Sequence, residues 1–183
     1  MDSRQGGRFV SPTEEPLICG VGTYTLEIIE DLPDVDTIIV PVGAGSGACG
    51  VSIVAKTINP NIEVIAVQSA QAPAMQRSWV SGELVTAEMN SFAEGVATRV
   101  PFENTQRIMR QYLDDFLLVD DDDDDIRQAV YLLLEHTHNL AEGAGAVSLA
   151  AALQVKQRLQ GKKVAIIMSG GNLSLENLKK ILS

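Results

Sequence analysis

Two glycine-rich turns carry the residue types best suited to holding a small anionic ligand. The first covers residues 43–50 with the sequence GAGSGACG and directly follows an apolar run. Small residues let backbone N–H groups approach an anion closely, and the N-terminus of a following helix adds a favourable partial charge. The second turn is Ser169-Gly170-Gly171-Asn172. Its serine hydroxyl can donate or accept one hydrogen bond with a flat ring. The two turns together predict a site for a phosphorylated ligand.

The first turn alone leaves other interpretations open. Glycine also serves tight strand-to-helix turns, so a purely structural role remains an alternative. No lysine follows the last glycine, which disfavours a nucleotide triphosphatase of the G-x-x-x-x-G-K-[ST] type. Gly45, Gly47 and Gly50 do satisfy the spacing G-x-G-x-x-G, and an acidic residue, Glu63, follows in the next strand. A dinucleotide-binding domain is therefore a rival hypothesis.

The elements that position both turns alternate between strands and helices. Continuous apolar runs predict buried strands at residues 37–42, 63–67, 116–119 and 164–168. Apolar spacing and turn residues predict helices at 23–32, 51–58, 72–81, 103–113, from the aspartate run to about 138, 143–159 and 173–182. This order predicts an α/β fold of three layers, with a mostly parallel sheet and helices on both faces, in a single domain spanning residues 1–183. Both turns then fall at carboxyl ends of strands, where such sheets bind ligands.

Composition excludes several classes of partner. A net charge of −10 argues against binding to nucleic acid or to an anionic membrane, because either needs a basic surface. No apolar run reaches the length of a membrane span, and the first residues lack the apolar core of a signal peptide. We therefore expect a cytoplasmic protein. Cys19 and Cys49 give neither a disulfide framework nor a metal-binding spacing, and Cys49 is expected to be a small buried filler.

Two further clusters of polar residues receive structural interpretations. The aspartates at residues 120–125 lack the glycine and the terminal glutamate of an EF-hand loop. We expect them to cap the following helix, since acidic residues there complement the helix dipole. His136 and His138 are two residues apart on a predicted helix, so they face different sides and do not form the usual i, i+4 metal pair.

From Arg8 onward the chain resembles the pyridoxal-phosphate-dependent threonine/serine dehydratases of fold type II. Five stretches carry the resemblance, in family order and with family-like spacing: GVGTYTLEIIEDLPDVDTIIVPVGAGSGACG, NPNIEVIAVQSAQAPAMQRSW, FAEGVATRVP, AEGAGAVSLAAAL and GKKVAIIMSGGN. An ordered set over nearly the whole chain is far more specific than a single glycine turn. The resemblance therefore favours a pyridoxal-phosphate site over the dinucleotide-binding alternative.

The resemblance also implies which residues bind the cofactor. Those placed on the family's glycine loop, whose amides hold the phosphate, are Gly43, Ala44, Gly45, Ser46 and Gly47. The family's loop is usually richer in glycine, and the hydroxyl of Ser46 would add a phosphate contact. Ser169, followed by Gly170, falls on the position that meets the pyridine nitrogen, where a neutral partner suits β-elimination. Glu142 falls on an acidic position near the cofactor ring.

The lysine that holds the cofactor covalently in this family belongs to a Ser-x-Lys-x-Arg-Gly type motif, and that motif is not in this sequence. The serine- and asparagine-containing loop of the family's small domain is not in it either. None of the six lysines has the required context, and Lys56, in the helix after the glycine loop, is expected to be solvated. We therefore assign no catalytic residue. We expect weak or phosphate-only binding of pyridoxal phosphate and no turnover by this chain alone.

Metal-binding members of the family place carboxylates beside the strand that is EVIAVQ here. This sequence has Gln68, Ala72 and Ala74 at those places, and neutral side chains are poor ligands for a hard cation, so no metal is expected. The implied function is part of a lyase that converts a hydroxy amino acid to a 2-oxo acid and ammonia. The alternative is a non-catalytic binding or oligomerisation module. Either way, an apolar surface that the small domain covers in the family would be exposed, which predicts a homo-oligomer.

Overall fold

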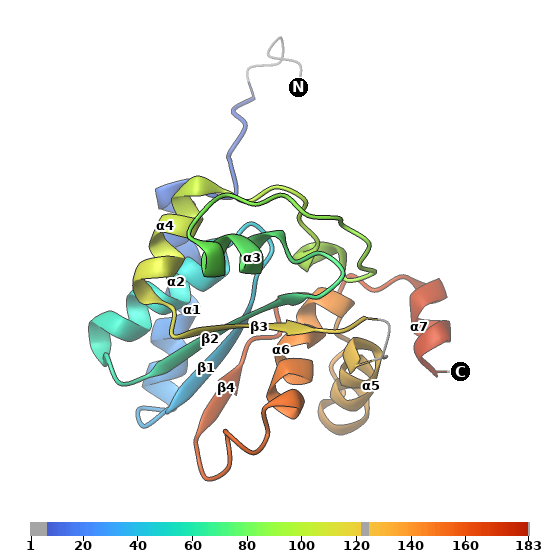
Figure 1. The fold of residues 1–183 in the computed structure, drawn as a ribbon. Coiled ribbons are helices and arrows are strands. Elements are labelled where there is room, and N and C mark those ends of the chain that lie inside the picture. The colour runs from blue at the N-terminus through green and yellow to red at the C-terminus, as the bar shows by residue number, and fades with distance from the viewer. Residues whose placement is uncertain (1–6, 122–124, 183) are drawn as a thin grey trace.

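The computed structural model describes residues 7–121 and 125–182, which form a parallel sheet between two layers of helices (Figure 1). The strands are β1 (Thr37–Pro41), β2 (Glu63–Ser69), β3 (Asp115–Val119) and β4 (Val164–Ile166), in the spatial order β3-β2-β1-β4. Every described pairing is parallel. The predicted α/β fold is confirmed.

The central strands are buried on both faces, as their continuous apolar sequences predict. In β1, Ile38 and Val40 face one core, while Ile39 faces the other, because successive side chains of a strand point to opposite sides. Residues of β2 divide in the same way, with Val64 in the first core and Ile65 in the second. The sheet therefore needs helices on both faces to cover it.

Helices supply that cover from separate parts of the chain (Figure 1). The first layer contains α1 (Glu15–Asp31), α2 (Ser46–Ile58), α3 (Ala74–Ser81) and α4 (Glu103–Tyr112). The second contains α5 (Asp125–Thr137) and α6 (Gly143–Gln154), with α7 (Leu175–Leu182) against α5 and a short 3-10 turn, η2 (Glu94–Val96), against α6. Within residues 7–121 and 125–182, no helix combines the length and the apolar character of a membrane span.

Two helices begin earlier than the sequence pattern predicts. Helix α1 starts at Glu15, and α2 starts at Ser46, inside the glycine-rich stretch that was expected to be a turn. The cause is close packing between the two helices. A Cβ on Gly50 would lie 2.8 Å from the Gly22 amide nitrogen, so both glycines are helical residues that permit the backbones to approach. Helix α6, by contrast, ends at Gln154, five residues before the predicted end.

Two residues of the aspartate run bind the loop after β2, in addition to the expected capping of a helix by the run. Asp121 is buried, and its carboxylate accepts hydrogen bonds from the Ser69 hydroxyl (2.7 Å) and from the Phe92 amide (3.2 Å). Asp120 accepts one from the Gln71 side chain (2.8 Å). These two aspartates fix the loop after β2, while Asp125 opens α5 as an acidic first-turn residue. The remaining three aspartates of the predicted cap, 122–124, lie outside the described residues.

Candidate functional site

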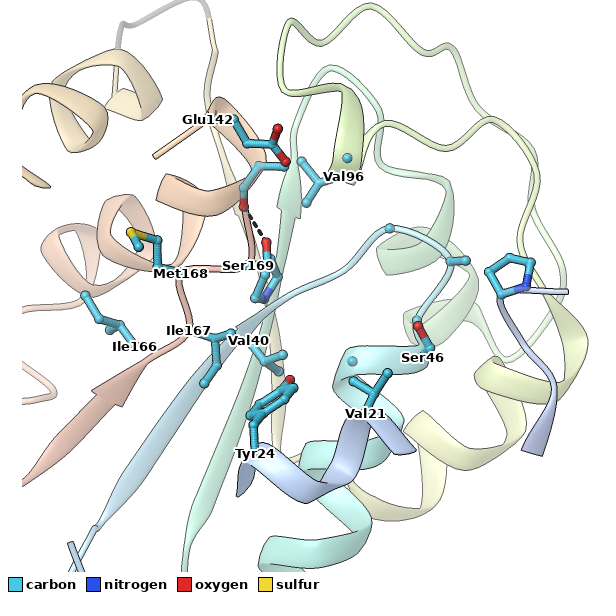
Figure 2. A pocket seen from close by; sticks show the side chains of 18 residues that line it. Val21, Tyr24, Val40, Ser46, Val96, Glu142, Ile166, Ile167, Met168 and Ser169 are labelled. Carbon is cyan, nitrogen blue, oxygen red and sulfur yellow. Dashed lines mark hydrogen bonds between the residues drawn. The ribbon is translucent and has the colours of Figure 1, made fainter. Parts of the chain in front are cut away.

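A pocket of about 760 Å³ opens at the carboxyl ends of β1 and β4, where the two glycine turns meet (Figure 2). Seven of the eight predicted site residues line it: Gly43, Ala44, Gly45, Ser46, Gly47, Glu142 and Ser169. The glycine loop and Ser169 come from segments more than a hundred residues apart in sequence. The parallel register of β1 with β4 brings the two turns to the same edge of the sheet.

The path of the glycine loop is fixed by close contacts. A Cβ on Gly43 would lie 2.3 Å from the Gly95 carbonyl oxygen. Gly45 has a φ of +98°, and a Cβ there would lie 2.9 Å from the Thr105 side chain. The Thr105 hydroxyl in turn donates a hydrogen bond to the Ala44 carbonyl at 2.7 Å. Close packing therefore requires glycine at two of the three loop positions. The same contacts hold the loop amides in place.

The N-terminus of α2 presents backbone donors to the pocket. The Cys49 amide makes the first intrahelical hydrogen bond, to the Gly45 carbonyl at 2.9 Å. The preceding amides of Ser46, Gly47 and Ala48 have no carbonyl partner within the helix, as is general for a first turn. No side chain caps this end of α2. Helix α2 has 13 residues, so its dipole favours negative charge at these amides.

Ser169 and Glu142 form another part of the pocket lining (Figure 2). The Ser169 hydroxyl donates to the Ala144 carbonyl across 3.4 Å, which is long for a hydroxyl hydrogen bond. A ligand acceptor can therefore compete for that proton at little cost. Glu142 lies directly before α6, and its carboxylate points toward the pocket from that helix end.

Gly170 is the predicted residue that does not line this pocket. Its carbonyl accepts a hydrogen bond from the Glu142 amide at 3.1 Å. A Cβ on Gly170 would lie 2.6 Å from Glu142 Oε1, and its carbonyl lies 2.3 Å from the place of a Cβ on Gly145. Gly170 therefore positions the start of α6 and the Glu142 side chain. That Gly170 contacts the cofactor stays a prediction.

Cationic side chains lie elsewhere in the protein. Among the described residues, no lysine or arginine lines the pocket. Lys56, which was expected to be solvated, is instead partly buried in an ion pair with Asp114 (2.7 Å) and donates to the Ile62 carbonyl (2.7 Å). Its helix points that side chain toward the amino ends of the strands. An anion in the pocket would therefore be bound by backbone amides and hydroxyls.

The dinucleotide-binding alternative depended on Glu63, and the structure places that residue at the wrong edge. Glu63 pairs in register with Thr37 at the amino end of β1, whereas the glycine loop follows the carboxyl end. Its carboxylate binds Arg158 and, at 3.0 Å, Lys162. Glu63 is therefore neither near the glycine loop nor available to a ribose hydroxyl.

The position considered for a metal is occupied by a hydrogen-bonded amide. The Gln68 side chain is buried, donates to Thr98 Oγ1 (3.0 Å) and to the Val96 carbonyl (3.3 Å), and accepts from the Gln76 amide (3.2 Å). These contacts tie β2 to the loop that carries η2. The described part of the chain contains no cluster of three or more His, Cys, Asp or Glu residues arranged for a metal. That no metal binds stays a prediction.

Cys49 is buried behind the glycine loop, as expected of a small filler. Burial raises the pKa of its thiol to about 12, although the nearby Arg107 acts to lower it. The thiol donates weakly to the Thr105 carbonyl at 3.5 Å. Because the thiolate is the reactive form, Cys49 has no nucleophilic role at neutral pH.

Several pocket residues were missed by sequence reasoning. Val21 and Tyr24 come from α1, Gly95 and Val96 from η2, and Ile167 from the segment after β4. The stretch FAEGVATRVP, which contains η2, carries part of the family resemblance and could have marked Gly95 and Val96. Tyr24 also lies in a stretch that carries the resemblance, GVGTYTLEIIEDLPDVDTIIVPVGAGSGACG, but its place at the pocket depends on how α1 packs against α2.

Comparison with known families identifies the chain. Residues 2–170 match the model of a family described as pyridoxal-phosphate dependent enzyme. The chain belongs to this family. Members of the pyridoxal-phosphate dependent enzyme family use that cofactor by definition, which confirms the cofactor class implied by the sequence resemblance.

Relatives with curated names are threonine ammonia-lyases and dehydratases. The chain is 40% identical over 185 residues to an L-threonine ammonia-lyase of Thermotoga maritima, with all of this chain and 45% of the relative aligned. It is 40% identical over 181 residues to the catabolic L-threonine dehydratase TdcB of Escherichia coli, covering 97% of this chain and 54% of the relative. The chain thus spans about half the length of the curated relatives it matches.

Solved structures of the same family share the fold. A processed threonine deaminase isoform from Solanum lycopersicum superposes with a TM-score of 0.90 at 30% identity, covering 98% of this chain and 53% of that one. A serine racemase from Dictyostelium discoideum gives a TM-score of 0.85 at 36% identity, covering 94% of this chain and 56% of that one. The α/β architecture is therefore that of fold type II pyridoxal-phosphate enzymes.

Proposed function

We propose that this chain supplies the phosphate-binding and ring-binding residues of a pyridoxal-phosphate lyase that deaminates a hydroxy amino acid to a 2-oxo acid and ammonia. The observation that carries the proposal is one pocket lined both by the N-terminus of α2 and by the Ser169 hydroxyl. Val40, Val96 and Ile167 provide apolar wall. Amide donors, an apolar wall and a hydroxyl are what a phosphorylated aromatic ring requires.

Each group has a distinct role in this proposal. The amides of Ser46, Gly47 and Ala48 bind the phosphate, with help from the Ser46 hydroxyl. Ser169 exchanges one hydrogen bond with the pyridine nitrogen and, being neutral, leaves that nitrogen largely unprotonated. Bound pyridoxal phosphate supplies an electron sink that weakens the bonds at the α-carbon of an amino acid. Glu142 places a carboxylate acceptor at the pocket, near the ring.

This chain lacks a lysine in the pocket, so we propose that its residues hold the cofactor without a covalent bond. All six lysines are among the described residues, and none lines the pocket. Proton transfer at the α-carbon in this family requires a lysine, and among the described lining residues only Glu142 and Tyr24 are titratable. Binding without turnover is the expected behaviour of the isolated chain.

The experiment is a titration of the purified chain with pyridoxal phosphate, followed by absorbance and calorimetry. We expect saturable, weak binding that inorganic phosphate competes away. Borohydride treatment should leave no cofactor attached to a specific lysine, and threonine or serine should release no ammonia. Absence of saturable binding would contradict the proposed site. Specific labelling of one lysine together with turnover would contradict the non-covalent part of the proposal.

A second candidate function, a binding or oligomerisation module, is favoured by the exposed edge of the sheet at β4. All three residues of β4 are only partly buried, and Met168, just beyond it, is 42% exposed. Leu149, Ile166 and Ile167 line an apolar groove of about 230 Å³ at this edge. Exposed apolar surface of this kind tends to find partners. Light scattering should show self-association, and a monomer at high concentration would contradict it.

The cytoplasmic location stays a prediction, which cell fractionation would test.

A further inference from the structure

The hydroxyl of Tyr24 lies beside the first turn of α2. Tyr24 extends from α1 toward Val40, with its hydroxyl directed into the pocket (Figure 2). A Cβ placed on Gly47 would lie 3.5 Å from this oxygen and 3.9 Å from Val40 Cγ2. The phenol therefore faces the open side of Gly47, in the same turn whose amides have no carbonyl partner.

This hydroxyl has no hydrogen-bond partner among the described residues, whereas its ring is well anchored. The ring packs against the core between the sheet and α1 and α2. Burial raises the pKa of the phenol to about 12, so the hydroxyl keeps its proton at neutral pH and acts as a donor. The hydroxyl itself lies on the open pocket, so its proton is available to a ligand that enters there. An anionic acceptor in the pocket would satisfy it.

The position of Tyr24 is set by the packing of two helices. Gly22 and Gly50 allow α1 to approach α2 closely, since a Cβ on Gly50 would lie 2.9 Å from the Ile18 carbonyl oxygen. Tyr24 follows Gly22 by two residues in α1, so this close crossing brings its side chain up to the start of α2. The donor is therefore held by backbone contacts and does not depend on a flexible side chain such as lysine.

We infer that Tyr24 is a phosphate-binding residue, whose hydroxyl donates a hydrogen bond to the phosphate group held at the N-terminus of α2. The inference rests on the proposed function and adds a second side-chain hydroxyl to that of Ser46. It supplies a further donor for an anion in a pocket whose described lining holds no lysine or arginine. Tyr24 and the α2 amides would share the phosphate oxygens, with the phenol on the α1 side.

The test compares Tyr24→Phe with the wild-type chain. Phenylalanine keeps the packed ring and removes only the hydroxyl. A matched control is Tyr131→Phe, because Tyr131 is exposed on α5 and bonds to Glu135 at 3.1 Å, in the opposite helix layer. Calorimetry measures binding of three probes: inorganic phosphate, pyridoxal phosphate, and pyridoxal without phosphate. Thermal unfolding of each variant confirms that the fold is retained.

Tyr24→Phe should weaken binding of both phosphate-containing probes about tenfold, the effect of one hydrogen bond to a charged group, and leave pyridoxal unchanged. Tyr131→Phe should match the wild type. Equal phosphate affinity in Tyr24→Phe and wild type would overturn the inference and leave the proposed function intact. An equal loss for pyridoxal would assign the contact to the ring and also overturn it. No binding of any probe by the wild type would overturn the proposed function and this inference with it.

A measurement on the unmodified chain keeps the inference testable if the variant unfolds. With tyrosines labelled at the ring carbon that bears the hydroxyl, added inorganic phosphate should shift the Tyr24 resonance and leave that of Tyr131 in place. An unmoved Tyr24 resonance at saturating phosphate would contradict the assignment.

Discussion

The two edges of the parallel sheet differ in how their polar groups are satisfied. At the amino edge, charged side chains pair with one another: Arg158 binds both Glu63 and Asp115, Lys163 binds Asp34, and Lys56 binds Asp114. At the carboxyl edge, the pocket is lined by backbone amides, three hydroxyls and one carboxylate, with no lysine or arginine among the described lining residues.

This difference separates stabilising charges from a ligand site. Arg158 joins β2 to β3 from the turn after α6, and its charge is already neutralised there by two carboxylates. Donors at the carboxyl edge have no such partner within residues 7–121 and 125–182: the first amides of α2 and the hydroxyl of Tyr24 lie at the pocket. The edge with fewer charges is therefore the one suited to an anion, because its donors are rigid and unpaired.

The largest loss of stability and binding is expected for Gly43→Ala, because the glycine loop is in close backbone contact with η2. Gly43→Ala would place a Cβ 2.3 Å from the Gly95 carbonyl oxygen, so the loop or η2 must move. We expect a loss of about 3 kcal/mol in unfolding free energy, the upper range for overpacking, and loss of phosphate binding. Urea denaturation measures the first and calorimetry the second.

Gly20→Ala is the matched control for that variant. Gly20 lies in α1 with nothing within 4 Å of a Cβ, so alanine should raise stability by about 0.5–1 kcal/mol. Wild-type stability in Gly43→Ala would show that the contact with η2 is not what shapes the loop.

A carboxylate at the start of α2 should weaken phosphate binding without lowering the stability of the fold. Position 47 has room for a Cβ, and an acidic residue near a helix N-terminus is favourable. We therefore expect Gly47→Asp to fold with wild-type stability. Its charge should weaken phosphate binding about 100-fold, as expected for a like charge within about 4 Å at a partly exposed site.

Gly47→Ala separates the effect of the charge from that of bulk. It should lower phosphate affinity far less than Gly47→Asp, when both are compared by calorimetry. Equal losses in the two variants would assign the effect to steric exclusion, and an unaffected Gly47→Asp would place the anion elsewhere.

At the amino edge, Arg158→Ala should lower the free energy of unfolding by about 1 kcal/mol, since two partly exposed ion pairs are lost. Burial acts to raise the pKa of Glu63, but hydrogen bonds from Arg158 and Lys162 outweigh it and hold that pKa below its ordinary value of 4.5. A lowered pKa stabilises the fold above the unfolded value, and this contribution disappears as the pH falls through the folded pKa. The difference between variant and wild type should therefore shrink below about pH 4.

Urea denaturation across pH measures this effect, with Arg77→Ala as the control, because Arg77 is exposed and makes no ion pair with the other described residues. Phosphate affinity should be unchanged in Arg158→Ala. A loss of phosphate binding in that variant would contradict the separation of the two edges.

The smallest effect is expected at Ser169, whose hydroxyl makes only a long bond to the Ala144 carbonyl. Ser169→Ala should lower the affinity for pyridoxal phosphate about fivefold, the worth of one neutral hydrogen bond, and leave inorganic phosphate binding unchanged. Parallel titrations with the two ligands measure this. A loss for both ligands would place Ser169 at the phosphate and not at the ring.

Much of the fold could be predicted because its strands are unbroken apolar runs. Residues 37–42 and 63–67 have no other stable place than a sheet covered on both faces, and the glycine loop then falls at the carboxyl edge. The starts of α1 and α2 could not be found in this way. Gly22 and Gly50 look like turn residues locally, and only the packing of α1 on α2 explains them as helical.

Sequence reasoning named residues where a residue type or a family motif carries the chemistry, as at Ser169 and the glycine loop, and the structure brings these residues into one pocket. Tyr24 was missed because its hydroxyl enters the pocket through tertiary packing of its ring. Lys56 was misjudged for a related reason, because its charge is paired with Asp114, which is distant in sequence. The pairing of Glu63 with Arg158 likewise removes the rival dinucleotide hypothesis.

The most direct test of the two-edge account is a map of backbone amide shifts in ¹⁵N-labelled protein as inorganic phosphate is added. We expect saturable amide shifts concentrated at Ser46, Gly47 and Ala48, with the amides of Glu63 and Arg158 unchanged. Shifts confined to the amino edge, or none at the start of α2 at saturating phosphate, would contradict it.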